Sequence, residues 1–593
     1  MKINFQYKIA MLFVLLSSQM LFAQKQDGQI GTEVVNVVKT YTPTISDAFK
    51  VKETPSLEDE DNSKKETIQY TIFSFPVAST FTPSKGKAAG VENETKEKSF
   101  NNYASFAAGN YGAINADLFV TQTLESGDYF GAMFRHLSSQ GGIKNVDLNN
   151  KFSNSSLDLT YGSKTNKLAW NGDFGYHRLS YNWYGINPIL FEGFSSTDKD
   201  LFLNGINPKQ TYQNIYFGGR LLLNEEFFKE VTIKFNHFSD AFSSRENRFV
   251  AIPTFQFDIM DVKLKTDFVL DYINGKFQKD YFDVSGLKYG FTNIGIKPSF
   301  QINKNDMLVN IGASFFYSLA TNGGQNKFFV YPSITASYKI VGDLMIAYAG
   351  AEGTLKQNSY QDFSQDNFFV SPTLAIAPTD QKFDLYFGLK GKLANTIAYN
   401  IRGALIDENN KALFKSNIFD VTNANNSGYA NGNSFGVVYD NVKSASLFGE
   451  LKADFSKNVS FGINGTFTSY VTKYEPQAWN LPGIKLSSTI DFNLTPKWYA
   501  GANIFFVGER KDQLIIIATN VQPWNTLPLQ GKNESVSLNS YFDLNTHLNY
   551  KHNERLTFFL KGNNLANQNY QKWMNYPVQG IQVLLGANYK FDF

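Results

Sequence analysis

The sequence predicts an all-β fold: a transmembrane antiparallel β-barrel of about 22 strands, with 16–20 strands as the alternative. Three observations support this fold. Segments of roughly ten residues with alternating apolar and polar side chains follow one another from residue 99 to residue 593. Aromatic residues make up 16% of the chain, yet its mean hydropathy is only −0.28. The chain also begins with the pattern of an export signal.

Residues 1–23 have the three parts of a secretory signal peptide in the expected order. Lys2 and Lys8 supply a positive start, an apolar stretch follows at 9–16, and the sequence LFA at 21–23 forms a cleavage site. The apolar stretch is too short to cross a bilayer as a helix. A core helix or a membrane anchor at the start of the chain is the alternative. We expect the mature protein to be exported.

Residues 24–98 differ in character from the rest of the mature chain. This segment is polar, shows little periodicity and contains an acidic run at 58–61. Such charge runs are typical of solvated chain. Two less polar stretches, at 33–45 and 68–77, are candidates for short strands or docking segments. We expect a short irregular segment that lies in the periplasm or inside the barrel lumen.

Alternation of side chains is clear throughout residues 99–593. In 447–455, 485–494 and 541–550, one face is mostly apolar and the other mostly polar or charged. A soluble sandwich also alternates, but roughly twenty such segments with almost no helical pattern would make an exceptional sandwich. A closed barrel in lipid explains both faces, because the apolar face meets hydrocarbon and the polar face meets a wet lumen.

The connections between the predicted strands also differ in length. Tight turns are predicted at 302–307, 456–460, 494–498 and 551–556. Long connections are predicted at 180–211 and 508–537. Short periplasmic turns and long external loops are expected of outer-membrane barrels. The strand pattern is weakest at 355–381 and 406–441.

The last strand, 581–593, follows the same pattern. Every second residue back from Phe593 is apolar, and Leu584 alone interrupts the polar set between them. The final strand of a closed barrel pairs with the first, so it has a lipid face and a lumen face like the others. We therefore expect Tyr589, Phe591 and Phe593 to belong to the barrel-closing strand. The terminal aromatic residue also resembles the signal by which insertion machinery recognises outer-membrane barrels.

Four stretches, in order, resemble the barrel of the TonB-dependent receptor family. They are SPTLAIAPTDQKFDLYFGLKGKL (371–393), VKSASLFGELKADFSKNVSFGINGTFTSY (442–470), LPGIKLSSTIDFNLTPKWYAGANIFFVGER (481–510) and FFLKGNNLANQNY (558–570). The chain departs from the family pattern at Ser371, where Asn is usual, and at Thr379, where Glu is common. The resemblance implies a 22-stranded barrel in the outer membrane of a Gram-negative bacterium, with a plug domain inside it.

The N-terminal segment departs further from that family. Residues 24–98 are too few for a standard plug domain, and the plug's Gly- and Arg-rich pattern is not visible. Residues 32–44 resemble a TonB box, a short strand that can add to another sheet. The residues that carry this resemblance are Glu33, Val34, Val35, Val37 and Val38. A local strand or a periplasmic docking peptide is the alternative, so the expected partner is TonB or another periplasmic protein.

Composition and motifs indicate neither an enzyme nor a nucleic-acid partner. The chain has 55 Lys and Arg against 53 Asp and Glu, without the basic stripe that nucleic acid requires. It has no Cys, which excludes disulfides and Cys-ligated metals. Its His residues form no spaced metal motif. Asp543 and His547 are about 13 Å apart on one strand, too far for a hydrogen bond. We therefore expect no catalytic, cofactor-binding or metal-binding residues.

Aromatic residues also gather in the first long connection, at Trp183, Tyr184, Phe191 and Phe194. An aromatic girdle or packing within the loop is the preferred interpretation, and stacking on a sugar or a partner is the alternative.

The function implied by the resemblance is reception and transport of a solute across the outer membrane. The alternative is a non-transporting barrel, a subunit of an outer-membrane protein assembly that docks partners through residues 24–98. In both cases outer-membrane lipid surrounds the barrel, and in the second other outer-membrane proteins are partners. The loops contain no feature that selects one substrate.

Overall fold

The computed structural model describes residues 99–593, except 226, 260–261, 283–284, 420–426 and 518–530. The predictions for the signal peptide at 1–23, the segment at 24–98 and the TonB-box-like residues 33–38 lie outside the described residues.

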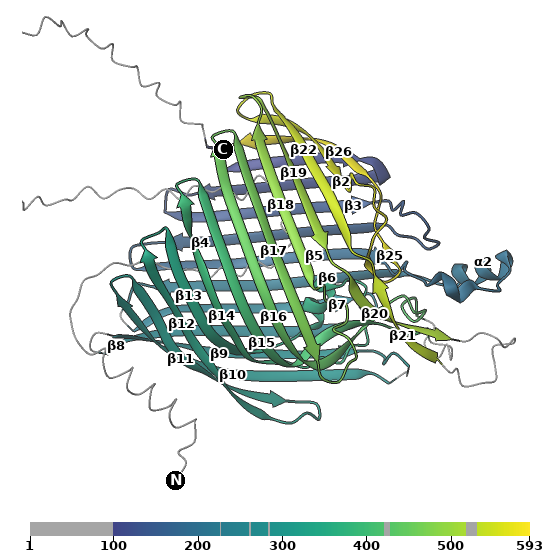
Figure 1. Cartoon of the computed structure of the whole chain (residues 1–593), viewed down its shortest axis with the longest axis horizontal. Helices are drawn as coiled ribbons and strands as arrows, with labels where there is room; N and C mark the ends of the chain where they lie inside the picture. Colours follow the sequence, from purple (N-terminus) through teal and green to yellow (C-terminus); the bar gives the residue numbers. More distant parts are fainter. Residues whose placement is uncertain (1–98, 226, 260–261, 283–284, 420–426, 518–530) are drawn as a thin grey trace, which may run out of the picture. The chain divides into compact units, whose positions relative to one another are not determined.

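Twenty-two strands form one closed antiparallel barrel, which confirms the predicted fold and strand number. Each strand pairs with the next barrel strand along the chain, and β1 pairs with β26 to complete the circle. In Figure 1 the green strands β16–β18 cross in front of the purple and blue strands β4–β7. The barrel strands are β1 (Asn102–Gly109), β2 (Ala113–Thr123), β3 (Asp128–Ser139), β4 (Phe152–Lys164), β5 (Leu168–Asn182), β6 (Lys209–Leu223), β7 (Phe228–Asp240), β8 (Arg245–Ile259), β9 (Val262–Phe277), β10 (Leu287–Lys304), β11 (Met307–Ala320), β12 (Lys327–Val341), β13 (Met345–Lys356), β14 (Thr379–Ala394), β15 (Ile397–Ser416), β16 (Phe435–Ser456), β17 (Val459–Thr472), β18 (Ile484–Asn493), β19 (Trp498–Val507), β22 (Tyr541–Lys551), β23 (Leu556–Asn563) and β26 (Gln582–Phe591).

The remaining elements belong to the connections. Two hairpins pair outside the barrel sheet. They are β20 (Arg510–Ile517) with β21 (Gly531–Leu538), and β24 (Gln571–Trp573) with β25 (Tyr576–Pro577). The short helical elements are η2 (Asn110–Gly112), η3 (Pro188–Phe191), α2 (Ser196–Asn204) and α3 (Tyr360–Asp366). Neither α-helix of the described chain has the length and hydropathy of a membrane-spanning helix.

The tight connections lie at one end of the barrel, which we call the turn end. The four turns predicted from the sequence are confirmed, and they join β10 to β11, β16 to β17, β18 to β19 and β22 to β23. Because antiparallel neighbours alternate in direction, every second connection along the chain lies at the same end as these turns, including β2–β3, β4–β5 and β8–β9. The alternate connections, such as β5–β6 and β13–β14, lie at the opposite, loop end. In the β10–β11 turn Asn305 has φ 51°, a left-handed conformation that Asn tolerates better than most residues.

The outer face of the barrel is apolar. Ile294 and Ile296 on β10 point outward and are exposed, as are Leu447 on β16 and Phe542 on β22 from the predicted apolar faces. Water-soluble monomers rarely expose contiguous apolar patches larger than a few hundred Å². An apolar face on strand after strand is therefore the surface of a barrel that hydrocarbon surrounds.

The closing strand pair explains the irregular residue of the last strand. Tyr589 is 45% exposed on the outer face and Leu585 is 66% exposed, as the alternation predicts. Leu584 points the other way, is 5% exposed and packs with Phe559 and Ala107. The apolar Leu584 therefore fills a small apolar cluster on the inner wall, where β1, β23 and β26 lie side by side.

Candidate functional site

Polar side chains of neighbouring strands pair across the inner wall of the barrel. Each pair joins a charged or phenolic group to a partner one or two strands away, so the wall is cross-linked by hydrogen bonds. The pairs include Arg248–Asp271 (2.7 Å), Arg402–Asp384 (2.8 Å), Tyr331–Asp380 (2.9 Å), Tyr386–Glu352 (2.8 Å) and Tyr348–Asn400 (2.7 Å).

One group on β4–β7 illustrates how glycine makes these contacts possible. Asp158 Oδ1 lies 2.7 Å from His177 Nε2 and accepts a hydrogen bond of 2.7 Å from the Tyr216 hydroxyl. The Tyr216 ring crosses Gly175, where an added Cβ would lie 1.9 Å from a ring atom. Lys234 Nζ lies 4.7 Å from the centroid of the same ring. Gly175 therefore provides the space that lets Tyr216 reach the carboxylate two strands away.

The connection between β13 and β14, residues 357–378, is the centre of the candidate site. We call it the mouth loop. It starts with helix α3, whose N-cap Ser359 accepts a hydrogen bond of 2.9 Å from the N–H of Asp362. Tyr360 is 0% exposed and Val370 is 0% exposed, although both lie in a loop. Burial of this extent shows that the mouth loop is packed among other parts of the chain and does not extend into solvent.

The first anchor of the mouth loop is a buried carboxylate on β8. Glu246 is 2% exposed. It accepts hydrogen bonds from the backbone N–H groups of Tyr360 (2.7 Å) and Gln361 (3.1 Å), and from the Tyr289 hydroxyl (2.6 Å). The first N–H groups of a helix have no partner within the helix, so the wall carboxylate satisfies two of them.

Three further contacts hold the same side of the mouth loop to β6–β8. The Tyr360 hydroxyl donates to Asp240 Oδ2 at 2.8 Å, and burial raises the pKa of Tyr360 well above its ordinary value. Arg248, already paired with the wall, lies 3.1 Å from Asp362. Tyr212 donates to the carbonyl of Phe368 at 3.2 Å. The α3 end of the loop is therefore bound to the wall by charged and phenolic groups.

The far side of the mouth loop contacts a different part of the wall. Val370 forms a parallel bridge with Phe435, and the Ser371 N–H donates to the Phe435 carbonyl at 2.8 Å. The Phe369 ring stacks on Tyr576 of the β24–β25 hairpin, with centroids 3.6 Å apart. Phe435 begins β16, and strands β9–β15 lie between β8 and β16 in the barrel order. The loop therefore crosses the lumen between two separated parts of the wall.

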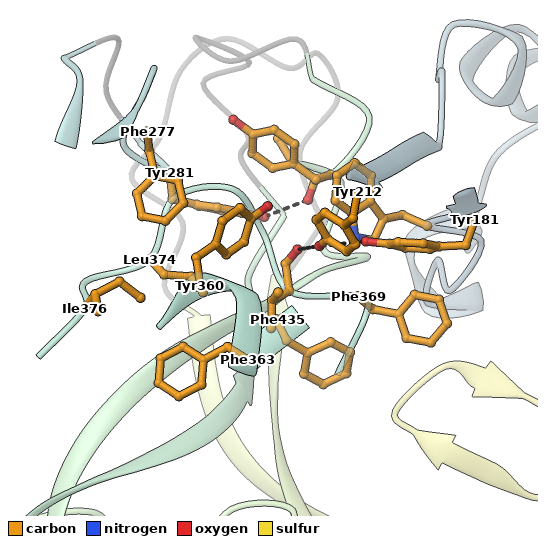
Figure 2. Packing of buried hydrophobic residues seen from close by; sticks show 14 of the residues in the cluster. Tyr181, Tyr212, Phe277, Tyr281, Tyr360, Phe363, Phe369, Leu374, Ile376 and Phe435 are labelled. Carbon is orange, nitrogen blue, oxygen red and sulfur yellow. Dashed lines mark hydrogen bonds between the residues drawn. The ribbon is translucent and has the colours of Figure 1, made fainter. Parts of the chain in front are cut away.

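Other loops of the same end converge on the mouth loop, and Figure 2 shows part of the resulting aromatic packing. We call this set of buried residues the mouth cluster. Its members are Tyr181, Trp183, Tyr212, Phe238, Ile273, Phe277, Tyr281, Tyr289, Tyr360, Phe363, Phe369, Val370, Leu374, Ile376, Tyr429, Ala430, Phe435, Leu538, Met574 and Tyr576. They come from the ends of barrel strands and from connections far apart in the sequence, so the mouth of the lumen is filled by the protein's own loops.

Two of the aromatic residues singled out in the sequence belong to this packing. Trp183 is 0% exposed, and Asn433 donates to its carbonyl at 2.8 Å. Tyr184 packs edge-on against Tyr576 at 4.8 Å. Phe191 and Phe194 instead pack with each other and with Phe202 of α2, in the connection between β5 and β6. Packing within loops, the preferred interpretation from the sequence, is therefore what the structure contains.

The β24–β25 hairpin is tied to the rest of the mouth by Arg510. The guanidinium donates to the carbonyl of Gln571 at 2.8 Å and to the carbonyl of Lys572. Gln579, just after the hairpin, donates to Ser139 Oγ at 2.7 Å. These hydrogen bonds position Tyr576 under the mouth loop.

The structure brings together residues that sequence reasoning did not connect. The site residues predicted from the sequence, Tyr589, Phe591 and Phe593, lie on and just after β26 and are not part of the mouth loop. The mouth loop fell in the stretch where the strand pattern is weakest. Its apolar run at 368–370, inside a predicted loop, is a signal that could have indicated burial.

The chemical groups considered for catalysis or metal binding have other partners. Asp543 accepts a hydrogen bond of 2.8 Å from Tyr570, and His547 Nε2 lies 3.7 Å from Asp491. The two side chains therefore have separate partners. In the described part of the chain, no group of three or more His, Cys, Asp or Glu is arranged to hold a metal ion.

No protein-family model and no curated protein sequence matches the chain. Its fold is similar to solved structures of outer-membrane proteins. The FrpB iron transporter from Neisseria meningitidis has a TM-score of 0.60 at 12% identity, over 84% of this chain and 82% of that one. The ferric-catecholate import receptor Fiu from Escherichia coli K12 has a TM-score of 0.57 at 11% identity, over 83% and 82%. The ferripyoverdine receptor of the Pseudomonas aeruginosa outer membrane has a TM-score of 0.58 at 11% identity, over 83% and 72%.

Proposed function

We propose that the chain is an outer-membrane barrel of a Gram-negative bacterium that receives a solute at its mouth and transports it through its lumen. The observation that carries this proposal is the mouth loop, which crosses a polar lumen and is held to the wall by hydrogen bonds. A barrel of this strand number is wide enough to pass solutes when it is empty. The loop also packs into the mouth cluster through Tyr360, Phe363 and Phe369, so as a gate it would open by leaving both this packing and its hydrogen bonds to the wall.

The likeness to iron and siderophore receptors supports this proposal, together with the resemblance of four barrel stretches to TonB-dependent receptors. We infer that residues 32–44 dock TonB or another periplasmic protein, and that residues 24–98 lie in the periplasm or in the lumen. Short as it is, that segment would not form a standard plug.

Cross-linking in cells tests the transport proposal. A photo-crosslinking residue at Val38 should capture TonB in energised cells, and an added Val35→Pro substitution should abolish both capture and solute-dependent growth. Pro cannot donate a backbone hydrogen bond to an added strand, so it prevents sheet augmentation. A matched Pro substitution in the acidic run, Asp59→Pro, should change neither. If TonB is captured equally well by both Pro variants, residues 32–44 are not the docking strand.

A second function is supported by the density of the mouth cluster. A mouth packed with aromatic residues at 0–7% exposure is also suited to a barrel that does not conduct. In that case the chain would be a subunit of an outer-membrane protein assembly. A native pull-down separates the two functions, because stoichiometric barrel partners would favour the assembly subunit and TonB capture would favour the transporter.

A further inference from the structure

Three cationic side chains lie directly opposite one another on neighbouring strands, close to the loop end of the barrel. They are Arg245 on β8, Lys276 on β9 and Lys288 on β10. In the register of the sheet, Lys276 pairs with Arg245 on one side and with Lys288 on the other. Adjacent strands are about 4.8 Å apart, so the backbone positions of all three residues fall within about 10 Å. We call these three residues the outer cationic row.

The alternation of side chains places the outer cationic row on the outer face. The residues next to it along the three strands point inward and are buried: Glu246 is 2% exposed, Phe277 is 2% exposed and Tyr289 is 6% exposed. The three cations therefore point to the opposite side, where they are exposed. Because Tyr289 also donates to Glu246 at 2.6 Å, the backbone that carries the row is fixed from the inside by the packed mouth.

The outer cationic row has no counter-charge of its own. No ion pair joins any of the three cations to a carboxylate within the described part of the chain. Like charges directly opposite one another in a sheet are destabilising. An anion that binds between neighbouring members of the row would relieve this repulsion.

A comparable place on β14–β16 carries its own carboxylate. Lys443 lies directly opposite Asp407, with its Nζ 3.9 Å from the carboxylate, and Lys382 Nζ lies 3.7 Å from the other oxygen. Asp407 follows the outward residue Leu405, which is 54% exposed, by two positions on β15, so it faces the same side. The barrel thus neutralises one group of outward cations internally and leaves the outer cationic row open to an external anion.

The position of the outer cationic row indicates which anion it meets. On the same strands, Leu270, Tyr272 and Ile294 are exposed on the outer face. Lys276 follows Tyr272 by four residues, which is about 13 Å along the strand and about 9 Å along the membrane normal at a tilt of about 45°. Tyr is typical of the boundary between hydrocarbon and water. The row therefore lies at the height of lipid headgroups, directly beyond the apolar band.

We propose that the outer cationic row binds the phosphate-bearing headgroup of an anionic lipid in the membrane leaflet at the loop end. A phosphate lies between neighbouring cations of the row, and the acyl chains of the same lipid lie against Tyr272 and Ile294. Arg245 can hold phosphate oxygens in a bidentate manner, and the two lysines act as point charges. A soluble anion or an acidic macromolecule would meet the charges alone, so the continuity of the charged and apolar surfaces favours a lipid.

Native mass spectrometry of the full-length protein in dodecyl maltoside micelles tests the proposal. The probes are dioleoyl phosphatidic acid and dioleoyl phosphatidylcholine, which have the same acyl chains but differ in headgroup charge. We expect the original chain to bind phosphatidic acid roughly tenfold more tightly than phosphatidylcholine, because the cations contact a charged phosphate. The Lys276→Gln/Lys288→Gln double variant should bind phosphatidic acid about fivefold or more weakly than the original chain does, with its affinity for phosphatidylcholine unchanged.

The matched control is the Lys382→Gln/Lys443→Gln double variant. It removes the same number of positive charges from the group of cations that already has a carboxylate. Its preference for phosphatidic acid should equal that of the original chain. Heat-modifiable migration on gels shows that the barrel of each variant is folded, so a loss of lipid binding is separable from a loss of structure.

Two results would overturn the proposal: equal affinity of the original chain for the two lipids, or the same loss of phosphatidic acid binding in both double variants. Glycerol 3-phosphate supplies the charged group without acyl chains, and it should bind far more weakly than phosphatidic acid. Equally tight binding of glycerol 3-phosphate would assign the row to a soluble anion. Heparin binding that the Lys276→Gln/Lys288→Gln variant abolishes, together with equal affinity for the two lipids, would assign it to an acidic macromolecule.

Discussion

The Glu246 carboxylate accepts a hydrogen bond of 2.7 Å from the backbone N–H of Tyr360, the first residue of α3. Strand β8 thus supplies the acceptor that the start of the helix needs, and the helix supplies donors to a carboxylate that is 2% exposed. Without Glu246 the first N–H groups of α3 would lose their acceptor, and without α3 the buried carboxylate would keep only the Tyr289 hydroxyl. This pairing makes the mouth loop part of the wall, and it is where we expect the loop to be most sensitive to change.

Replacing Glu246 with Ala should release the α3 end of the mouth loop. Two backbone N–H groups and the Tyr289 hydroxyl would lose their acceptor, at a cost of about 1–3 kcal/mol for each buried group left unpaired. Amide hydrogen exchange over 357–378 should accelerate by roughly tenfold or more. Glu246→Gln should give an intermediate rate, because the amide keeps one acceptor oxygen.

Asp128→Asn is the control for this substitution. Asp128 lies at the start of β3 beside the turn end and accepts from Ser126 and Tyr161. The Asp128→Asn substitution should leave amide hydrogen exchange in the mouth loop unchanged. Equal exchange in the Glu246→Ala and original proteins would mean that the carboxylate does not hold the loop.

Gly175→Ala should destabilise the barrel, whereas Gly172→Ala on the same strand should not. An added Cβ at Gly175 would lie 1.9 Å from a Tyr216 ring atom, and at Gly172 it would meet nothing within 4 Å. Overpacking of this kind costs about 1–3 kcal/mol. Gel migration after heating to increasing temperatures measures the difference in thermal stability between the two variants. Identical midpoint temperatures of unfolding for the two variants would show that the Tyr216 ring is free to move aside.

Protonation of Asp512 should favour the attachment of the β20–β21 hairpin. Its carboxylate accepts from the Ser416 N–H (3.1 Å) and hydroxyl (2.9 Å), and burial raises its pKa. A carboxyl group whose pKa is higher in the folded state contributes most when protonated, so this stabilisation is lost as pH rises through the folded pKa. Hydrogen exchange at Ser416, corrected for the intrinsic pH effect, should therefore slow on acidification. Asp512→Asn should remove that dependence, and a dependence that persists in the Asn variant would assign it to another group.

Phe593→Ala should reduce assembly into the outer membrane several-fold, if the terminal aromatic residue is the insertion signal. Phe593 is 79% exposed, and its ring packs edge-on against Phe591 at 5.5 Å. The control is Phe558→Ala, which removes an outward aromatic residue of β23 that is 44% exposed. The measurement is the amount of heat-modifiable, folded barrel in outer-membrane fractions. Equal losses in both variants would indicate a general effect of removing lipid-facing rings.

The sequence predicted the barrel because barrel strands obey a local rule. Alternation at 447–455 and 541–550 needs only a lipid side and a lumen side, and the position of each residue in its strand decides which it faces. The tight turns at 494–498 and 551–556 are equally local. Closure of β26 on β1 then follows, because an open sheet edge is not tolerated in hydrocarbon.

The mouth could not be predicted in the same way. Glu246 and Tyr360 are separated by 114 residues, and neither lies in a pattern that points to the other. Phe369 stacks on Tyr576 of the β24–β25 hairpin, which Arg510 and Gln579 hold in place. Such contacts depend on the relative position of loops that the barrel brings together, which a local periodicity does not encode.

Single-channel conductance in planar bilayers tests the central claim, that the protein's own loops close the mouth of a lipid-embedded barrel. The two proteins compared lack residues 24–98, and one also has residues 360–376 replaced by a short Gly/Ser linker. We predict small or no conductance steps for the protein with the mouth loop and large, stable steps for the protein without it, because a barrel of this width conducts when open. Large steps from the protein that retains its mouth loop would contradict the claim.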